Sequence, residues 1–592
     1  MSTPSPINYE KRRRVFLRQA NTTYFSSAMN AALTDREKRL SDCLSALRRH
    51  QTKLFTNPSV DIPTSSLPPS SHGQPPGSIH FFQIHEYMQT TPLFKLLKAM
   101  PKGGLLHVHC DALVDRKFII RKLAEWADRC YMRIWKREKS YPGAEGQTTD
   151  VPMFRFASSI PVDGEEWVSV KEARDNFSDG GPEGFDAWLY RCTTLRDRKG
   201  EFSRSTAVFP SEHAVWHEFE NCFLTLSGLI QYFPLLKLYI REICNRYYLK
   251  EGVQYAEVRM PYIVPYDDKA TETLTFDDVF KDAELAQREF KEKLREQGGD
   301  ADADGFLGFK IIYSILRRIP RPEMRWHLDN AWRMRKLYPT LLAGFDLVGH
   351  EEKGNPLRHY IPEFLDFLRA QEGHSSEETL KFFLHAGETG NVGTEVDYEN
   401  LVDALLLGTK RIGHGFAISK WLGSIGTWVK DHEVALEVCP ISNQVLGLVH
   451  DLRNHPIGVW FGWSGAPSPL EALEREEEGK QDIPSKLSFI PVTISPDDPA
   501  LFGYEGVTED YWELFMSFDA LNLAGLKQLI WNSVQYSAIV DEEKEKAMAV
   551  IKRLWEEWVE WAVEEAGRAM VEAAVPEMDG ELTLVAKELS GY

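Results

Sequence analysis

Two histidines two residues apart close a short apolar run, GLLHVH (104–109). Side chains two apart on a β-strand point to the same side, so His107 and His109 face one way together if this run is a strand. Neutral imidazoles are good ligands for zinc, and a pair of them predicts a metal site. Two core histidines satisfied by ordinary hydrogen bonds are the alternative interpretation.

Three more side chains suited to catalysis lie at the ends of later apolar runs. His385 and Glu388 end LKFFLHAGE (380–388), and His414 lies in RIGHGF (411–416). A carboxyl group three residues after a ligand histidine is well placed to act as a general acid or base without binding the metal. The glycines on both sides of His414 allow other groups to approach it closely.

Two further runs end in an aspartate pair and in a glycine. Asp497 and Asp498 close SFIPVTISPDD (488–498), and Gly349 closes LLAGFDLVG (341–349). Taken alone, two aspartates before a proline are commonly a turn or a helix cap. Their place at the end of an apolar run, as for the histidines, favours a role in a site.

These run ends together supply three imidazoles and one carboxylate. The predicted zinc ligands are His107, His109, His385 and Asp497. Such a set leaves room for a water molecule, and zinc lowers the pKa of that water toward about 7. Glu388 is then the predicted proton shuttle, and His414 is predicted to orient or stabilise the hydroxide.

A fold that brings these ends together is predicted by the spacing of the runs. Eight short apolar runs occur, most of them separated by segments of helical length. They are 104–109, 253–260, 309–316, 341–349, 380–388, 411–416, 434–440 and 488–498. Continuous apolar runs are typical of parallel strands buried on both faces, and eight of them with helical crossovers predict a (β/α)8 TIM barrel. A doubly wound sheet is the alternative.

Composition limits the class of partner and the compartment. The chain has 592 residues and a formal net charge of −19, which disfavours nucleic acid and anionic membrane as the main partner. No apolar run is long enough to span a membrane. We find no secretory signal, and seven scattered cysteines without a CxxC pair suit a reducing compartment, so we expect a cytoplasmic protein. Secretion by an unconventional route stays open.

Changes in composition divide the rest of the chain. We expect an N-terminal helical extension over 1–92, with a helical part (1–55) that the barrel does not need and a Pro/Ser-rich linker over 56–78. The barrel is expected over 93–540, with an inserted subdomain after strand 1 at about 136–215. A polar loop, 464–484, is expected on the barrel face opposite the site. A C-terminal helical segment follows over 541–592.

Several of these motifs, taken in order, resemble the adenosine deaminase family, and most closely its growth-factor-related branch. They are MPKGGLLHVHCDA (100–112), GFDLVGHE (344–351), HAGET (385–389), RIGHGF (411–416), EVCPISNQVLG (437–447), DLRNHP (451–456) and ISPDDP (494–499). The likeness extends from about Leu93 to Ser537. It implies a TIM barrel that uses zinc to convert adenosine, and by extension 2′-deoxyadenosine, to inosine and ammonia.

The resemblance also implies roles for single residues. Glu388 would protonate the purine at N1 while hydroxide attacks C6, and His414 would support the hydroxide. Asp498 would contact N7, the Gly349 amide would contact N3, and Asp111 would hold the ribose. The four zinc ligands inferred above are the same in this family.

The count of metals, the oligomeric state and one pocket residue are further expectations. Binuclear hydrolases with an HxH strand commonly carry a modified lysine at the end of strand 4, and GFDLVGHE (344–351) has none there, which favours one zinc per chain. The family likeness of the N-terminal extension predicts a homodimer. Trp216 is a candidate for the pocket wall, with ordinary core packing as the alternative.

Two other functions stay open at this stage. A deaminase for a phosphorylated adenine nucleotide or another purine would need cations at the site mouth, and Arg317, Arg318 and Arg321 are candidates, unless they are solvated loop charges. A signalling or nucleoside-binding protein of growth-factor type would be expected to lack a ligand or Glu388. All of these residues are present, which favours an enzyme.

Overall fold

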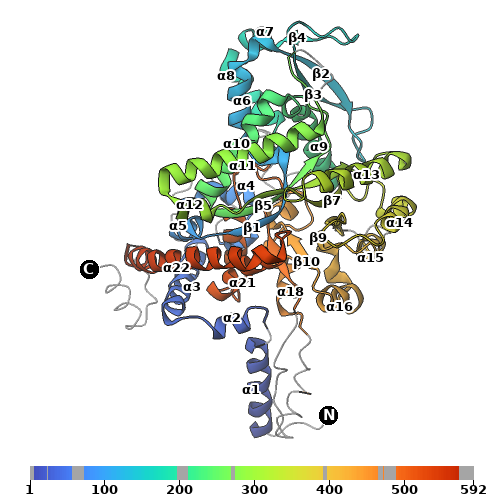
Figure 1. Ribbon diagram of the computed structural model, residues 1–592. Coiled ribbons are helices and arrows are strands. Elements are labelled where there is room, and N and C mark those ends of the chain that lie inside the picture. The colour runs from blue at the N-terminus through green and yellow to red at the C-terminus, as the bar shows by residue number, and fades with distance from the viewer. Residues whose placement is uncertain are drawn as a thin grey trace.

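The computed structural model describes residues 6–22, 24–56, 73–196, 211–268, 274–390, 397–464, 471 and 489–572. A set of parallel strands lies at its centre (Figure 1). These strands are β1 (Gly103–His109), β5 (Val253–Pro261), β6 (Gly308–Leu316), β7 (Leu342–Val348), β8 (Leu384–Ala386), β9 (Arg411–His414), β10 (Ala435–Val438) and β11 (Val492–Ile494). Each overlaps one of the eight predicted runs, so the prediction of these strands is confirmed.

The eight strands follow one another around a ring. Two parallel sheets have the orders β1-β5-β6-β7 and β8-β9-β10-β11. A parallel bridge between Phe345 and Phe382 joins β7 to the segment before β8, and a bridge between Val108 and Asp497 joins β1 to the segment after β11. Neighbours in space are therefore neighbours in sequence, as in a (β/α)8 barrel. A doubly wound sheet would instead reverse its strand order at a switch point.

Helices connect successive strands. They are α6 (Arg116–Glu125), α9 (Glu212–Ile230) and α10 (Phe233–Glu251) before β5, α11 (Phe276–Gly298) and α12 (Asp300–Gly305) before β6, α13 (Arg321–Leu337) before β7, α14 (Ile361–Ala370) before β8, α15 (Glu399–Leu406) before β9, α16 (Thr427–Asp431) before β10, and α17 (Pro440–Val445) and α18 (Ile457–Gly462) before β11. Local sequence sets several of their starts. Thr275 and Asp278 form a reciprocal capping box at α11, and a proline occupies the first turn of α13.

A small antiparallel sheet lies between β1 and β5 in sequence, at the top of the view in Figure 1. It consists of β2 (Cys130–Glu138), β3 (Thr148–Phe156) and β4 (Val168–Ser169), in the order β3-β2-β4, and is followed by α7 (Val170–Asp175) and α8 (Gly181–Cys192). Strand β2 pairs along its whole length with β3, from Cys130↔Phe156 to Glu138↔Thr148. The inserted subdomain therefore begins near Cys130, a few residues before the predicted start at about 136, which falls inside β2.

Among the N-terminal helices, α3 (Asp35–Thr56) is packed firmly against the rest of the molecule. The others are α1 (Pro6–Thr22), α2 (Ser27–Ala31), α4 (Phe81–Met88) and α5 (Pro92–Ala99). In α3, Leu40, Leu44 and Leu47 are buried in the main core, and the Arg48 guanidinium donates to the carbonyls of Phe515, Phe518, Asp519 and Leu521. Helix α3 is therefore part of the main core, while a barrel that forms without residues 1–55 stays a prediction.

The chain after β11 completes the surface that α3 covers. It forms α20 (Thr508–Ser517), α21 (Leu523–Gln535) and the long α22 (Asp541–Glu572), which runs beside α3 (Figure 1). Glu37 of α3 accepts hydrogen bonds from Lys527 of α21 and from the indole of Trp555 of α22. Helix α3 and the C-terminal helices α21 and α22 are thus packed together on one side of the barrel.

Some expectations concern residues outside the described part of the chain. These are most of the predicted linker (57–72), and the polar loop 464–484 apart from Ser464 and Glu471. Within the described residues, no helix is both long enough and apolar enough to cross a membrane. All seven cysteines are described and none forms a disulfide.

Candidate active site

The predicted ligands meet at one end of the barrel. His107 and His109 end β1, His385 is in β8, and Asp497 follows β11. Asp497 Oδ1 lies 3.3 Å from His107 Nε2 and 3.2 Å from His109 Nε2, and the rings of His107 and His385 have centroids 4.5 Å apart. The carboxyl ends of barrel strands share one face, so residues almost 400 positions apart in sequence converge there.

The donors in this cluster fit a metal ion. One ring nitrogen from each of His107, His109 and His385 lies within 4.8 Å of the other two. Among the described residues, His107 Nε2 and Asp497 Oδ1 are buried and have no hydrogen-bond partner. Burial also lowers the pKa of His385 to about 3, which keeps its ring in the neutral form that binds metals. Three imidazoles and a carboxylate are donors that zinc accepts.

Two buried carboxylates hold the rings of His107 and His385 from behind. Glu437 Oε2 lies 2.7 Å from His107 Nδ1, and Asp346 Oδ2 lies 2.6 Å from His385 Nδ1. Each contact orients a ring and leaves its Nε2 to face the cluster, which is the usual support of a metal-binding histidine. Burial opposes ionisation of Asp346, but His385 and Arg259 hold its pKa well below the ordinary range.

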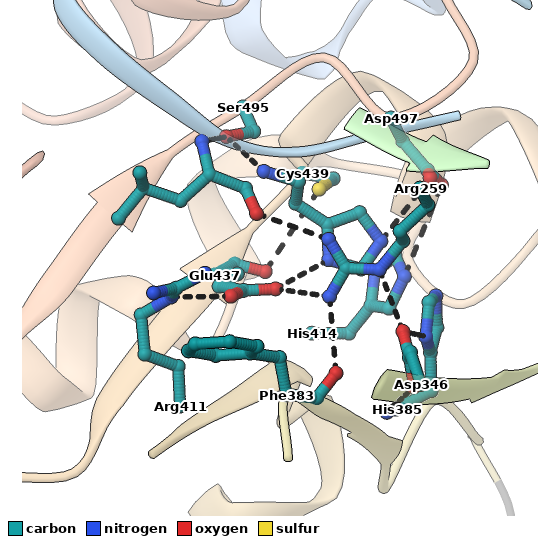
Figure 2. A network of polar contacts seen from close by, with 12 residues as sticks. Arg259, Asp346, Phe383, His385, Arg411, His414, Glu437, Cys439, Ser495 and Asp497 are labelled. Carbon is teal, nitrogen blue, oxygen red and sulfur yellow. Dashed lines mark hydrogen bonds and ion pairs between the residues drawn. The ribbon is translucent and has the colours of Figure 1, made fainter. Parts of the chain in front are cut away.

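One arginine joins these two carboxylates (Figure 2). The Arg259 guanidinium, on β5, donates to Asp346 Oδ2 at 2.6 Å and to Glu437 Oε2 at 2.6 Å, and all three side chains are fully buried. Arg411 continues the network by donating to Glu437 Oε1 and to Glu257 Oε2. Paired charges of this kind avoid the large cost of an isolated buried charge.

Sequence reasoning did not assign this charge network. Most of its members lie in the middle of predicted strands, in VQYAEVRM (253–260), LLAGFDLVG (341–349) and VALEVCP (434–440), and Arg411 begins RIGHGF (411–416). The available signal was the presence of charged residues inside otherwise apolar runs, because buried charges must be paired. The partner of each charge depends on strand order, which is a property of the closed barrel.

His414 occupies a strained position beside the cluster. Its ring centroid is 4.6 Å from that of His107, and its backbone φ is +60°, as that of Asp497 is +62°. A left-handed backbone conformation is unfavourable for residues other than glycine, and such strain is concentrated at functional sites. A Cβ on Gly413 would lie 2.9 Å from the His107 ring, so the glycine before His414 permits the close approach that its sequence suggested.

Glu388 faces this cluster from the loop after β8. Its Oε1 is 3.5 Å from His414 Nε2. Glu351 positions the loop by accepting hydrogen bonds from the backbone amides of Gly387 and Glu388. Burial, and then the charge of Asp497, raise the pKa of Glu388 well above its ordinary range, which favours a protonated carboxyl group.

A second carboxyl group on this face is also raised in pKa. Burial, and then the charge of Asp497, raise the pKa of Asp498 well above its ordinary range, and Asp498 Oδ1 has no partner among the described residues. Burial likewise raises the pKa of Asp111. Asp497 is the contrary case, since burial opposes its ionisation but the rings of His107 and His109 hold its pKa well below the ordinary range.

These groups line one pocket with a volume of about 510 Å³. Of the residues predicted for the site, the pocket wall includes His109, Asp111, Trp216, Gly349, His385, Glu388, His414, Asp497 and Asp498. The Trp216 ring stacks on His350, with centroids 4.4 Å apart and planes 26° apart. Apolar side chains such as Phe219 and Leu446 complete the wall, so the pocket combines a polar floor with apolar sides, as small-molecule sites generally do.

The three arginines after β6 differ in their surroundings. Arg318 donates to Glu220 at 2.8 Å, and Arg321 donates to Glu363 at 2.8 Å. Arg317 is buried, lines the pocket and donates to the carbonyls of Leu347 and His385. Two of these three cations are therefore already paired with carboxylates.

Comparison with known proteins identifies the family. A family profile described as adenosine deaminase matches residues 203–463. The chain is 32% identical over 495 residues to adenosine deaminase 2 of Homo sapiens, covering 82% of this chain and 83% of that protein. It is 30% identical over 543 residues to the adenosine deaminase of Phlebotomus duboscqi, covering 90% and 89%. The chain belongs to the adenosine deaminase family.

This membership confirms the resemblance seen in the motifs, and with it an enzyme of the hydrolase class. Among solved structures, the chain is similar to an adenine deaminase from Arthrobacter aurescens, with a TM-score of 0.44, 17% identity, and coverage of 78% of this chain and 99% of that one. In the present protein, the pocket and the candidate metal cluster lie together at one end of the barrel.

Proposed function

We propose that this protein is a zinc-dependent deaminase of adenosine, and of 2′-deoxyadenosine, that releases inosine or 2′-deoxyinosine and ammonia. The observation that carries the proposal is the pairing of a metal-ligand cluster with a buried carboxyl group of raised pKa, Glu388, across one pocket. Several relatives named adenosine deaminase share most of the chain, which supports this choice of substrate.

His107, His109, His385 and Asp497 would hold one zinc ion per chain. Bound there, the ion would supply a hydroxide nucleophile at neutral pH by lowering the pKa of water toward about 7. Asp346 and Glu437 keep the rings of two of these ligands oriented. His414, packed against His107, would accept a hydrogen bond from that nucleophile.

The carboxyl groups supply the protons that the purine needs. Carbon C6 of adenine is a poor electrophile, so attack there requires a proton at N1 as the nucleophile adds. Glu388 is the donor, because its raised pKa keeps it protonated until the purine arrives. The Glu388 carboxylate would then take the proton of the hydroxyl group added at C6 and pass it to the amino group, so that the C6–N bond breaks, C6 becomes a carbonyl and ammonia departs, while the first proton stays at N1.

The remaining pocket residues orient the nucleoside. Purine N7 is an acceptor, so its partner must donate, and the raised pKa of Asp498 suits that role. The Gly349 amide is assigned to purine N3. Gly349 follows β7 and has a φ of +102°, a conformation in which the backbone turns at the end of the strand. Asp111 is assigned to the ribose hydroxyls, and Trp216 forms a wall of the pocket.

The rival substrate is a phosphorylated adenine nucleotide. A phosphate would need free cations at the mouth, but Arg318 and Arg321 are paired with carboxylates. Arg317 donates through one nitrogen to two backbone carbonyls, while its Nε and its other terminal nitrogen have no partner among the described residues. Two of the three candidate cations therefore favour a nucleoside, and Arg317 is the residue through which a phosphate would bind. A binding protein without catalysis would not require the protonated Glu388 beside the metal ligands.

The test is an ultraviolet absorbance assay of the purified protein with adenosine, 2′-deoxyadenosine, AMP, ATP and adenine, before and after treatment with a chelator. We expect deamination of the two nucleosides, loss on chelation, and recovery when zinc is restored. Faster turnover of AMP than of adenosine would overturn the assignment of substrate. Full activity in metal-free protein, verified by elemental analysis, would overturn the assignment of mechanism.

A further inference from the structure

A second group of metal-binding side chains lies at the rim of the pocket, separate from the histidines of its floor. His213 is in the first turn of α9, and His350 and Glu352 lie in the loop after β7. One ligand atom from each of the three lies within 4.8 Å of the other two. We call these three residues the rim cluster.

The histidines of the rim cluster have unused nitrogens. His350 is only 2% exposed, yet within the described part of the chain neither of its ring nitrogens has a hydrogen-bond partner. The same holds for His213 Nδ1. Buried polar atoms are almost always paired, so unpaired imidazole nitrogens that converge with a carboxylate indicate a missing ligand.

The charges around the rim cluster favour a cation. Glu212, next to His213, has a buried Oε1 without a partner among the described residues. Burial, and then the charge of Glu352, raise the pKa of Glu212 to about 7. A positive ion between the elements that carry Glu212 and Glu352 would stabilise both carboxylates.

Two cations near the rim cluster have partners elsewhere, and a third, Lys420, donates to the carbonyl of Gly390 while its charge also acts on Glu212. Arg318 is paired with Glu220, and Lys353 Nζ donates to the carbonyl of Ser140. Burial, and then the charge of Lys353, lower the pKa of His350 to about 3, which leaves its ring neutral. A neutral imidazole is the form that coordinates a metal ion.

We propose that His213, His350 and Glu352 form a second metal site, for zinc or a similar divalent transition ion, at the rim of the pocket. Two imidazole nitrogens and one carboxylate oxygen are a donor set that such ions accept, with a position left for water. The ion would join α9 to the loop after β7. Because α9 also carries Trp216, which stacks on His350, the ion would brace one wall of the pocket.

This site goes beyond the proposed function, because none of its residues is assigned to the zinc at the floor. It is also expected to be the weaker of the two. No carboxylate contact is described behind the ring of His213 or His350, whereas His107 and His385 each have one. Loss of such support typically weakens metal binding by about 10–100-fold. The floor should therefore fill first and the rim second.

The experiment counts metal ions on the full-length protein. Protein is equilibrated by dialysis against a series of buffered free zinc concentrations, and bound zinc is measured by elemental analysis. We expect a first, tight equivalent and a second, weaker one. His213→Ala should bind about one ion fewer than the wild type at saturation, and Glu352→Gln should weaken the second equivalent by at least about tenfold.

A matched control excludes casual surface binding. His374 and Glu378 are an exposed histidine–glutamate pair four residues apart, away from the pocket, so His374→Ala should keep both equivalents. Circular dichroism and retention of the first equivalent show that each variant is folded. The proposal fails if wild-type protein takes up no second ion, if His213→Ala still binds as many ions as the wild type, or if His374→Ala loses the second one. Because the readout is a difference of one ion between variants, it does not depend on whether the protein deaminates adenosine.

Discussion

The floor and the rim of the pocket are both clusters of histidine and carboxylate, but they are built differently. At the floor, His107 and His385 are each held by a buried carboxylate, and Arg259 ties those two carboxylates together. At the rim, His213 and His350 have nitrogens without described partners, and Glu212 is kept partly protonated by its surroundings. The floor is preorganised by charges, whereas the rim is not.

This difference indicates what each cluster does. When a metal binds to a preorganised set of ligands, little free energy is needed to order the side chains. Such a set also holds the ion in one geometry, as catalysis requires. Ligands that are left unpaired bind more weakly and suit an ion that comes and goes with its concentration. The network of Arg259 is therefore as much a part of the proposed active site as the ligands that it supports.

The largest effect is expected from removing a floor ligand. His107→Ala should lose both the tight zinc and deaminase activity, because the remaining donors cannot hold the ion in place. Elemental analysis should fall from about one zinc per chain to nearly none, and turnover should fall below detection. A variant that keeps zinc and activity would show that the floor is not the metal centre.

The next largest effect is expected from the proton donor. Glu388→Gln keeps the size of the side chain and all the metal ligands, but it cannot deliver a proton to N1. Turnover should fall by at least about a hundredfold with KM changed far less, since general acids and bases contribute about 10²–10⁴ in rate. Steady-state kinetics and zinc analysis of the same sample test this. Loss of zinc in this variant would mean that Glu388 is itself a ligand.

A smaller effect should come from the support behind the ligands. Asp346→Asn removes the charge that holds His385 and pairs with Arg259. Zinc affinity, measured by competition with a chelator, should fall by about 10–100-fold. Uptake of the second ion at the rim should not change. If both equivalents weaken together, the two clusters are coupled and the comparison drawn between them is wrong.

The smallest effect is expected at the rim, in the pH dependence of stability. The pKa of Glu212 is about 7 in the folded protein against an ordinary value of 4.5. The folded state therefore binds more protons than the unfolded state between these values, and its stability falls as pH rises through this window. Glu212→Gln stays neutral, so it should be more stable than the wild type at pH 8 by about 1 kcal/mol, after allowance for partial exposure.

Chemical denaturation without added zinc, at about pH 4 and about pH 8, tests this sign, because the two proteins should be equally stable below the window and differ fully above it. Added zinc should remove the difference at the higher pH, since an ion at the rim would stabilise the ionised carboxylate. A variant that is less stable than the wild type at the higher pH would show that Glu212 is ionised and paired there.

The main site could be predicted closely from the sequence. The eight apolar runs indicated the strands, and the polar residues at their ends indicated the face on which His107, His109, His385, Glu388 and Asp497 would meet. This worked because the carboxyl ends of parallel barrel strands share one side, so position within a run is enough to place a side chain. Side chains two apart on a strand add direction to that position.

Tertiary structure decided the properties that depend on neighbours distant in sequence. Strand order brings Arg259 of β5 between Asp346 of β7 and Glu437 of β10, and no local pattern contains that contact. Packing of α3 against α21 and α22 made α3 part of the core, although its sequence alone predicted a helix outside the barrel. The raised pKa of Glu388 arises from burial and from the charge of Asp497, more than a hundred residues away, so only the folded chain sets it. Residue type and spacing thus determined which groups are present on the catalytic face, and the closed barrel determined their charges, their partners and the second cluster at its rim.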